Sequence, residues 1–281
     1  MLLRDYQENI VERLTQAFND GFKAPCVVSP CGSGKTVMMC ELAKNNKNTL
    51  ILLHRKELKE QMENTLENYG INMDTVRVEM IQTLVRRLSK TEKPTLIMTD
   101  ENHHSLATSY IKVYDYFNDV RRIGFTATPI RLNGDGLIQT NDCLIQGLTV
   151  QELIEKNNLS PFKYYGSPLV DLSTIKKSRG DFNTTEVETA LGTNEVHGRI
   201  IEHYLKFAKG TQAICYCPTV AYSEKIAEEF AMHGISSANI SGNTPSDKRD
   251  NIISNFKNGT ISILCNVDIV SEGQYRDLRG K

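Results

Sequence analysis

The sequence predicts an α/β fold made of two parallel-sheet lobes, the second of them incomplete. Strands and helices alternate through the first 130 residues, which is the pattern of a parallel sheet with helices on both faces. A second alternating run begins at Gln212. We expect a first lobe over residues 1–145, a connector over 146–210 and a partial second lobe over 211–281.

The composition narrows the class of protein. The 281 residues are enough for two domains, and 40% hydrophobic and 24% charged residues are typical of a globular chain. The net charge of −1 gives no overall basic signal, so binding to nucleic acid must come from a local patch. No apolar run approaches the ~20 residues that span a membrane, and the first residues lack the features of a secretory leader. We therefore expect a cytoplasmic protein with no membrane partner.

The seven cysteines are scattered along the chain and include no C-x-x-C pair. Cys215 and Cys217 flank Tyr216 in an expected strand, and we expect their side chains to point to opposite faces. The pattern therefore predicts neither a zinc site nor a disulfide framework, and a reducing cytosol is the expected setting.

The first strand leads into a glycine-bearing turn that predicts a phosphate site. An apolar run over 26–28 precedes the turn, and a helix-compatible run over 37–44 follows it. Glycines let backbone N–H groups converge on phosphate oxygens, and the helix N-terminus adds partial positive charge. The expected nucleotide-binding residues are Pro30, Cys31, Gly32, Ser33, Gly34, Lys35 and Thr36.

Two of these residues have expected chemical roles. Lys35 would reach the β- and γ-phosphates, and the Thr36 hydroxyl would ligate Mg²⁺. Ser29 stands where the strict pattern has glycine, and the alternative is a Gly/Ser loop without a ligand. Upstream, residues 1–20 predict an amphipathic helix that carries Gln7. Its amide offers a donor and an acceptor to adenine, although an exposed glutamine on such a helix is the common alternative.

Later strands of the first lobe end in polar residues. The buried strand 49–53 is followed by His54 and Arg55, which could hold a phosphate backbone or simply begin a solvated helix. The strand 96–98 runs into Asp100 and Glu101. We expect Asp100 to make a second contact to Mg²⁺ and Glu101 to orient and deprotonate the attacking water.

The same stretch contains two further candidates. His103 and His104 are adjacent, and adjacent histidines rarely face one metal ion, so a zinc site is not expected. The strand 123–125 ends in Thr126, Ala127 and Thr128, whose hydroxyls suit a relay between nucleotide and strand-binding surfaces. A threonine-rich turn before proline is the alternative.

The rest of the chain repeats the alternating pattern after a less regular segment. Helices are expected over 150–157 and 195–207, with a polar turn over 178–183 between them. The second lobe is expected to contain strands 213–217, 235–240 and 261–265 and helices 220–233 and 245–256.

Taken in order, these blocks resemble the motifs of the superfamily 2 helicases, in particular DEAD/DEAH-box and restriction-subunit-like proteins of phages. Residues 3–7 resemble the adenine-reading element, 29–36 motif I, 53–61 motif Ia, 82–84 motif Ib, 100–104 motif II and 125–129 motif III. Residues 215–221 resemble motif IV and 266–273 motif V, and the stretch 180–183 occurs in the connector of phage-type members.

The resemblance implies a nucleic-acid-dependent ATPase with two RecA-like, P-loop NTPase lobes in which ATP and Mg²⁺ bind in a cleft. It implies catalytic roles for Lys35, Asp100 and Glu101 and adenine contacts from Arg4 and Gln7. The implied coupling residues are His103, Thr126 and Thr128. The implied nucleic-acid contacts are His54, Arg55, Gln61, Gln82, Thr83, Thr219 and Asn266. DNA is favoured over RNA as the partner, in the cytoplasm of a bacterial or phage-infected cell.

Two departures from the family pattern qualify the expected activity. After Gly273 the family usually has a residue and then Asp, whereas this chain has Gln274 and Tyr275. Motif VI, which supplies arginine fingers, is absent, and Arg276 and Arg279 are poor substitutes. We therefore expect a chain truncated before motif VI, in which a partner chain or a second copy supplies the arginine.

Three other functions remain open at this point. The chain could be the motor subunit of a restriction complex whose nuclease is a separate chain. It could also be a module that binds ATP and nucleic acid without turnover, as the missing motif VI would predict. A P-loop kinase or transporter ATPase is the most distant alternative, because these classes lack the block at 126–128.

Overall fold

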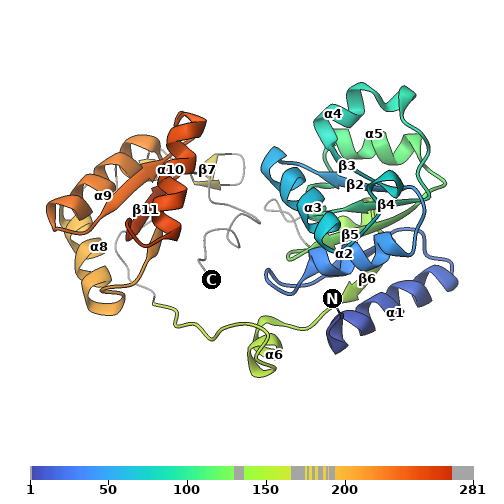
Figure 1. Ribbon diagram of the computed structural model, residues 1–281, viewed down its shortest axis with the longest axis horizontal. Helices are drawn as coiled ribbons and strands as arrows, with labels where there is room; N and C mark the ends of the chain where they lie inside the picture. Colours follow the sequence, from blue (N-terminus) through green and yellow to red (C-terminus); the bar gives the residue numbers. More distant parts are fainter. Residues whose placement is uncertain are drawn as a thin grey trace. The chain divides into compact units, whose positions relative to one another are not determined.

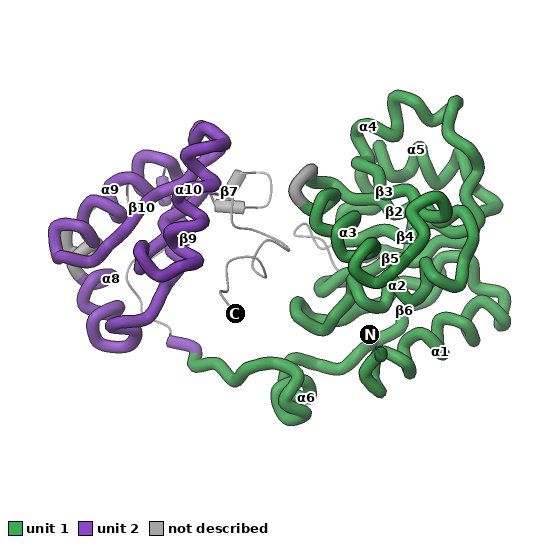
Figure 2. The backbone as a smooth tube through the Cα atoms, in the orientation of Figure 1, with its two compact units in different colours: residues 1–163 green, residues 164–281 purple. Residues whose placement is uncertain are grey.

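The computed structural model describes residues 2–129, 136–165, 175, 177–178, 181–182, 186–187, 189 and 194–267. The chain divides into two compact units, Met1–Lys163 and Tyr164–Lys281, which are coloured separately in Figure 2. Each unit has its own parallel sheet, as the alternating pattern predicts.

The first unit is built on a six-stranded sheet in which every neighbouring pair is parallel (Figure 1). Its strands are β1 (Pro25–Val28), β2 (Thr49–Leu53), β3 (Val76–Met80), β4 (Leu96–Thr99), β5 (Arg121–Thr126) and β6 (Cys143–Gln146). They lie in the order β3-β2-β4-β5-β1-β6. Because the strands are parallel, the segments that follow β1, β2, β4 and β5 all leave from one edge of the sheet, where open α/β sheets bind their ligands.

Helices cover both faces of this sheet (Figure 1). The helices of the unit are α1 (Asp5–Asn19), α2 (Lys35–Lys44), α3 (Lys56–Asn68), α4 (Ile81–Arg86), α5 (Thr108–Tyr116) and α6 (Val150–Glu155). Short 3₁₀ turns occur at Met73–Thr75, Leu88–Lys90, Asn102–His104 and Leu137–Gln139. One hydrophobic core packs α1, α2 and α3 against the sheet, and a second core packs α4 and α5 against its other face.

The strand β2 shows how the sequence produces two cores. All five of its residues are buried, and successive side chains point to opposite faces of the sheet. Ile51 and Leu53 belong to the core under α1–α3, whereas Leu50 and Leu52 belong to the core under α4 and α5. A continuous apolar run is therefore what a central strand of a doubly covered parallel sheet requires.

The second unit has a smaller parallel sheet in the order β10-β11-β9. Its elements include α8 (Asn194–Phe207), β9 (Ala213–Tyr216), α9 (Val220–Met232), β10 (Ser237–Ile240), α10 (Ser246–Lys257) and β11 (Ile263–Asn266). Side chains of α8 and α9 share one core with the sheet, and Phe256 of α10 packs on Leu264 in another. A short antiparallel pair, β7 (Lys177–Ser178) and β8 (Asp181–Phe182), lies in the stretch expected to be a polar turn.

The segment expected to be a connector is divided between the units. The helix α6 falls in the first unit, whereas α8 contributes Ile201 and Tyr204 to the core of the second. The strand β6 was not expected. It is only four residues long, with Ile145 buried, Cys143 half-buried and the other two residues exposed, and it pairs with β1 at the side away from β5. No helix in the described part of the chain is long and apolar enough to cross a membrane.

The expectation that Cys215 and Cys217 point to opposite faces is wrong. Their sulfur atoms lie 3.7 Å apart. Residues i and i+2 of a strand share a face, because the side-chain period of a strand is two residues.

Candidate active site

The loop between β1 and α2, here called the phosphate loop (residues 29–36), has the backbone that a phosphate site needs. Gly32 has φ +81° and Gly34 has φ +84°, which are conformations that side chains with a Cβ rarely adopt. The helix α2 begins at Lys35, directly after Gly34, so its N-terminus faces the loop. The Lys35 ammonium donates a hydrogen bond to the Ser29 carbonyl at 3.3 Å, across the turn.

The helix α1 braces the phosphate loop. Tyr6 Oη and Gln7 Nε2 both donate to the Ser33 carbonyl, at 2.8 and 3.0 Å. Gln7 Oε1 accepts from the Arg4 backbone N–H at 2.9 Å, and the Gln7 side chain is buried. A Cβ placed on Gly34 would lie 2.3 Å from Gln7 Nε2, so the loop and the amide fit closely only because Gly34 has no side chain. This bracing role was not expected, and the adenine contacts of Arg4 and Gln7 stay predictions.

Asp100 and Glu101 follow β4 at the edge of the sheet that carries the phosphate loop. The Asp100 carboxylate accepts a hydrogen bond from the Glu101 backbone N–H at 3.0 Å. Glu101 is buried and has φ +47° and ψ +54°. A non-glycine residue in this left-handed region costs about 1–3 kcal/mol, and such residues are concentrated at functional sites.

Close polar contacts through His103 link Glu101 to the end of β5. His103 Nδ1 lies 3.5 Å from Glu101 Oε2 and 3.1 Å from Thr126 Oγ1. Thr126 is fully buried, and its hydroxyl donates to the Thr128 carbonyl at 2.9 Å and accepts from the Thr128 N–H at 3.1 Å. The Ser29 N–H donates to the Thr126 carbonyl at 2.9 Å, so the phosphate loop starts beside the same residue. The structure therefore brings the three expected coupling residues together.

Sequence reasoning missed a buried polar network behind Glu101. Asn102 is buried, and its Nδ2 donates to Asn141 Oδ1 at 2.7 Å and approaches Cys26 Sγ at 3.4 Å. Asn141 in turn donates to the Ala24 carbonyl at 3.0 Å. Burial raises the pKa of Cys26 to about 12, so this thiol stays neutral at physiological pH. The network ties the segment after β4 to the strands β1 and β6.

A glycine in β5 provides the space for Asn102. A Cβ placed on Gly124 would lie 2.3 Å from Asn102 Cγ. A glycine inside a buried strand is a signal of close approach by a neighbouring group, and the stretch 122–125 contains one. Read together with an asparagine where the family usually has alanine or cysteine, this glycine could have indicated the network.

The residues expected to contact nucleic acid in the first unit lie on segments after β2 and β3. Gln82 is exposed on α4, and its Nε2 donates to the His54 carbonyl at 3.4 Å. Thr83 is exposed beside it, whereas Arg55 is half-buried at the start of α3. Gln61 is half-buried farther along α3. The His54 ring also lies 4.6 Å from the His104 ring, which connects this group to the segment that carries Glu101.

The two candidates of the second unit differ in their surroundings. Thr219 caps α9, where its hydroxyl accepts from the Tyr222 N–H at 3.2 Å. Asn266 is fully buried at the end of β11, and its Nδ2 donates to the Cys215 carbonyl at 3.2 Å. Their contacts to nucleic acid stay predictions. Arg276, Arg279 and the motif V residues beyond 267 lie outside the described residues.

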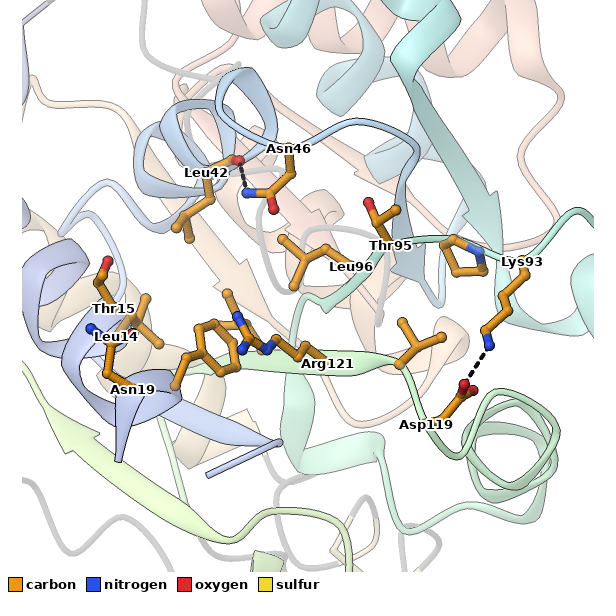
Figure 3. A pocket seen from close by; sticks show the side chains of 14 residues that line it. Leu14, Thr15, Asn19, Leu42, Asn46, Lys93, Thr95, Leu96, Asp119 and Arg121 are labelled. Atoms are coloured by element: carbon orange, nitrogen blue, oxygen red, sulfur yellow. Dashed lines mark hydrogen bonds and ion pairs between the residues drawn. The ribbon is translucent and has the colours of Figure 1, made fainter. Parts of the chain in front are cut away.

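A cavity of about 680 Å³ lies away from these residues, at the start of the strands (Figure 3). Leu96 and Arg121, the first residues of β4 and β5, line it, and an ion pair joins Lys93 to Asp119 at its rim. Since β4 and β5 are parallel, this cavity is at the edge opposite the phosphate loop. It is therefore separate from the candidate active site.

Two family models match separate parts of this chain. Residues 1–131 match the family model described as type III restriction enzyme, res subunit, and residues 197–274 match the helicase conserved C-terminal domain. A 51.5 kDa protein of a Lactococcus phage is 40% identical over 251 residues, which covers 88% of this chain and 55% of that protein. The putative ATP-dependent helicase IRC3 of Saccharomyces cerevisiae is 30% identical over 312 residues, covering 97% of this chain and 45% of that protein. The chain thus spans about half the length of the curated relatives it matches.

Solved structures with the same fold include two helicases. The Hef helicase domain of Pyrococcus furiosus aligns with a TM-score of 0.58 at 14% identity, covering 96% of this chain and 87% of that one. A variant of Saccharomyces cerevisiae Dbp5 bound to RNA and ADP BeF3 aligns with a TM-score of 0.54 at 13% identity, covering 96% and 75%. These likenesses confirm two RecA-like lobes. The two family models, together with the phage and yeast relatives, show that this chain belongs to the superfamily 2 helicases, of the restriction-subunit type.

Proposed function

We propose that this chain hydrolyses ATP in its first unit and uses the hydrolysis to move along nucleic acid, with DNA favoured over RNA. One observation carries the proposal. The phosphate loop follows β1, the Asp100–Glu101 pair follows β4, and Thr126 is the last residue of β5. These three are neighbouring parallel strands of one sheet. The groups needed for phosphoryl transfer are therefore collected at one edge.

The donor set fits a nucleotide triphosphate with Mg²⁺. Gly32 and Gly34 have positive φ angles, as in backbone turns whose successive N–H groups bind anions, and Lys35 adds a cation to the same loop. The Thr36 hydroxyl and the Asp100 carboxylate are oxygen donors of the kind that Mg²⁺ prefers. Bound Mg²⁺ would neutralise charge on the β- and γ-phosphates. Glu101 would orient the attacking water and accept its proton.

We propose that binding of a nucleic-acid strand affects the hydrolytic site through His54 and His103. Gln82 holds the His54 backbone, the His54 ring lies against His104, and His103 lies between Glu101 and Thr126. A nucleic acid held by the segments after β2 and β3 would thereby bias the position of Glu101. In the second unit, Thr219 and Asn266 are proposed to serve the same nucleic acid.

The proposal is tested by measuring ATP hydrolysis by the full chain alone and with single-stranded DNA, duplex DNA or RNA. We expect stimulation that is larger with DNA. Lys35→Ala removes the cation at the phosphates and should lower the rate at least about 100-fold. Stimulated turnover would imply that an arginine arrives from Arg276, Arg279 or a second copy.

Two results would point to the other functions. Nucleotide binding that Lys35→Ala abolishes, with no turnover on any nucleic acid, would indicate a binding module. Turnover that appears only when a nuclease partner is added would indicate the motor subunit of a restriction complex. The match of residues 1–131 to a restriction-subunit model makes the second result worth testing directly.

The coupling path predicts a specific defect. Thr126→Val removes the hydroxyl that joins His103 to the Thr128 backbone. We expect hydrolysis without nucleic acid to change little, and the stimulation by DNA to fall about 2- to 30-fold, the range of typical coupling energies. Thr49→Val is a matched control, because Thr49 is equally buried in the same sheet but lies at the start of β2. Equal loss of basal and stimulated rates in Thr126→Val would refute a coupling role.

A further inference from the structure

Three cysteines of the second unit converge on one point. Cys215 in β9 is in register with Cys265 in the neighbouring parallel strand β11. Cys217 follows two residues after Cys215 and therefore shares its face. The three sulfur atoms all lie within 4.8 Å of one another, and this is the one group of three or more cysteine, histidine or acidic residues that converges in this way among the described residues.

The spacing of the sulfur atoms matches ligands around a single ion. A Zn–S bond is about 2.3 Å long, so thiolates on one ion are about 3.8–4.0 Å apart in tetrahedral or trigonal geometry. The distance from Cys215 Sγ to Cys217 Sγ is 3.7 Å. A disulfide would join two of the three sulfurs and leave the third beside it without a role. One ion uses all three.

The surroundings select a soft metal ion. Cys217 and Cys265 are buried, and Tyr222 and Ile226 of α9 pack around them in the same hydrophobic core. Cys215 is only half-buried, which leaves a route from solvent. The converging set contains no carboxylate or imidazole, and all-sulfur sites favour thiophilic ions over Mg²⁺ or Ca²⁺.

We propose that Cys215, Cys217 and Cys265 form a binding site for one thiophilic d¹⁰ metal ion, of the Zn²⁺ or Cu⁺ class. Binding replaces thiol protons, which are released to solvent, and leaves a fourth position open to a small ligand.

The site would fix the strand ends that carry two of the proposed nucleic-acid residues. Asn266 Nδ2 donates to the Cys215 carbonyl, and the Cys217 N–H donates to the Asn266 carbonyl at 2.9 Å. Thr219 is only two residues beyond Cys217. Any effect of the metal on strand binding rests on the proposed function, but the metal site itself does not, so its test measures binding of the ion alone.

The test is a titration of the reduced full chain with Cd²⁺, a Zn²⁺ stand-in whose bonds to thiolates absorb in the ultraviolet, and separately with Cu⁺ under anaerobic conditions. A Cys31→Ser background removes the exposed thiol of the phosphate loop. We expect one ion per chain by native mass spectrometry and a rise in the melting temperature of the second unit. Cys217→Ser should lose both effects, whereas Cys40→Ser, at a buried thiol of the first unit, should keep them.

Cys215→Ser guards against a folding artefact. Because Cys215 is half-buried, this change disturbs the core less than Cys217→Ser, and it should also lose the ion. The proposal is overturned if neither ion binds, or if binding is unchanged in both variants. It is also overturned if peptide mapping of the unreduced chain finds a disulfide between two of the three cysteines Cys215, Cys217 and Cys265.

Discussion

Glu101→Gln is expected to lower ATP hydrolysis by about 10²–10⁴-fold, the usual contribution of a general base. Glutamine has nearly the same size and shape as glutamate, but its neutral amide cannot accept a proton from the attacking water. Glu101 has a left-handed backbone and is buried beside His103, so its carboxylate is held in a fixed position, as a general base requires. Nucleotide binding should persist, because the phosphate loop is unchanged, and a fluorescent ATP analogue measures it independently.

Glu79→Gln is the matched control for this prediction. The Glu79 side chain is 14% exposed against 10% for Glu101, and it lies on the same sheet, in the outermost strand β3. Its partner is Arg87, so the change should cost some stability and leave hydrolysis near the level of the unmodified chain. A Glu101→Gln enzyme that hydrolyses ATP as fast as Glu79→Gln would show that another group accepts the proton.

Gly124→Ala is expected to destabilise the first unit by about 1–3 kcal/mol through overpacking. The added Cβ would lie 2.3–2.7 Å from three atoms of the Asn102 amide. Its backbone is not in the left-handed region, so the penalty comes from the collision alone. Urea denaturation followed by a probe in the first unit measures the change, since two units are expected to give two transitions.

The double variant Gly124→Ala/Asn102→Ala tests whether the lost stability comes from the collision between the new methyl group and the Asn102 amide. Asn102→Ala alone removes the donor to Asn141 and should cost about 1–3 kcal/mol. In the double variant the new methyl group has room, so the total cost should be smaller than the sum of the single costs, with a coupling of about 0.5–3 kcal/mol. Gly136→Ala is the control, because no atom of the residues that the structure describes lies within 4 Å of its added Cβ. Additive costs would contradict the packing described for Asn102.

Most of the first unit could be predicted because local pattern and tertiary structure agree there. Short apolar runs such as 49–53 are typical of the central strands of a parallel sheet, and the glycines before Lys35 mark a turn that few other residues could form. The strand β6 could not be predicted in the same way. Its four residues form an edge strand in which Leu144 is 57% exposed. The sequence of such a strand therefore shows no clear run or alternation of apolar residues.

The sequence indicates which residues belong to the candidate site better than it indicates which other residues they contact. A motif names Glu101 and His103, but Asn102 meets Asn141 only because β1 and β6 pair over a long sequence separation. Gln7 shows the same limit: its amide has the chemistry to read a base, and the structure uses that amide to hold the Ser33 carbonyl. Residues that could serve either a ligand or the fold cannot be assigned from their type alone.

The position of β1 in the sheet also sets the order in which the chain can fold during synthesis. Val28 pairs with Thr126 on one side and Gln146 on the other, so neither partner exists when the phosphate loop leaves the ribosome. Pairings between distant segments form slowly, because closing the long loop costs entropy before any contact is gained. A nascent chain that ends before residue 121 therefore exposes an apolar β1 without neighbours. Its nucleotide site can be assembled only after the last strands of the first unit have emerged, which makes the growing chain dependent on protection from aggregation until then.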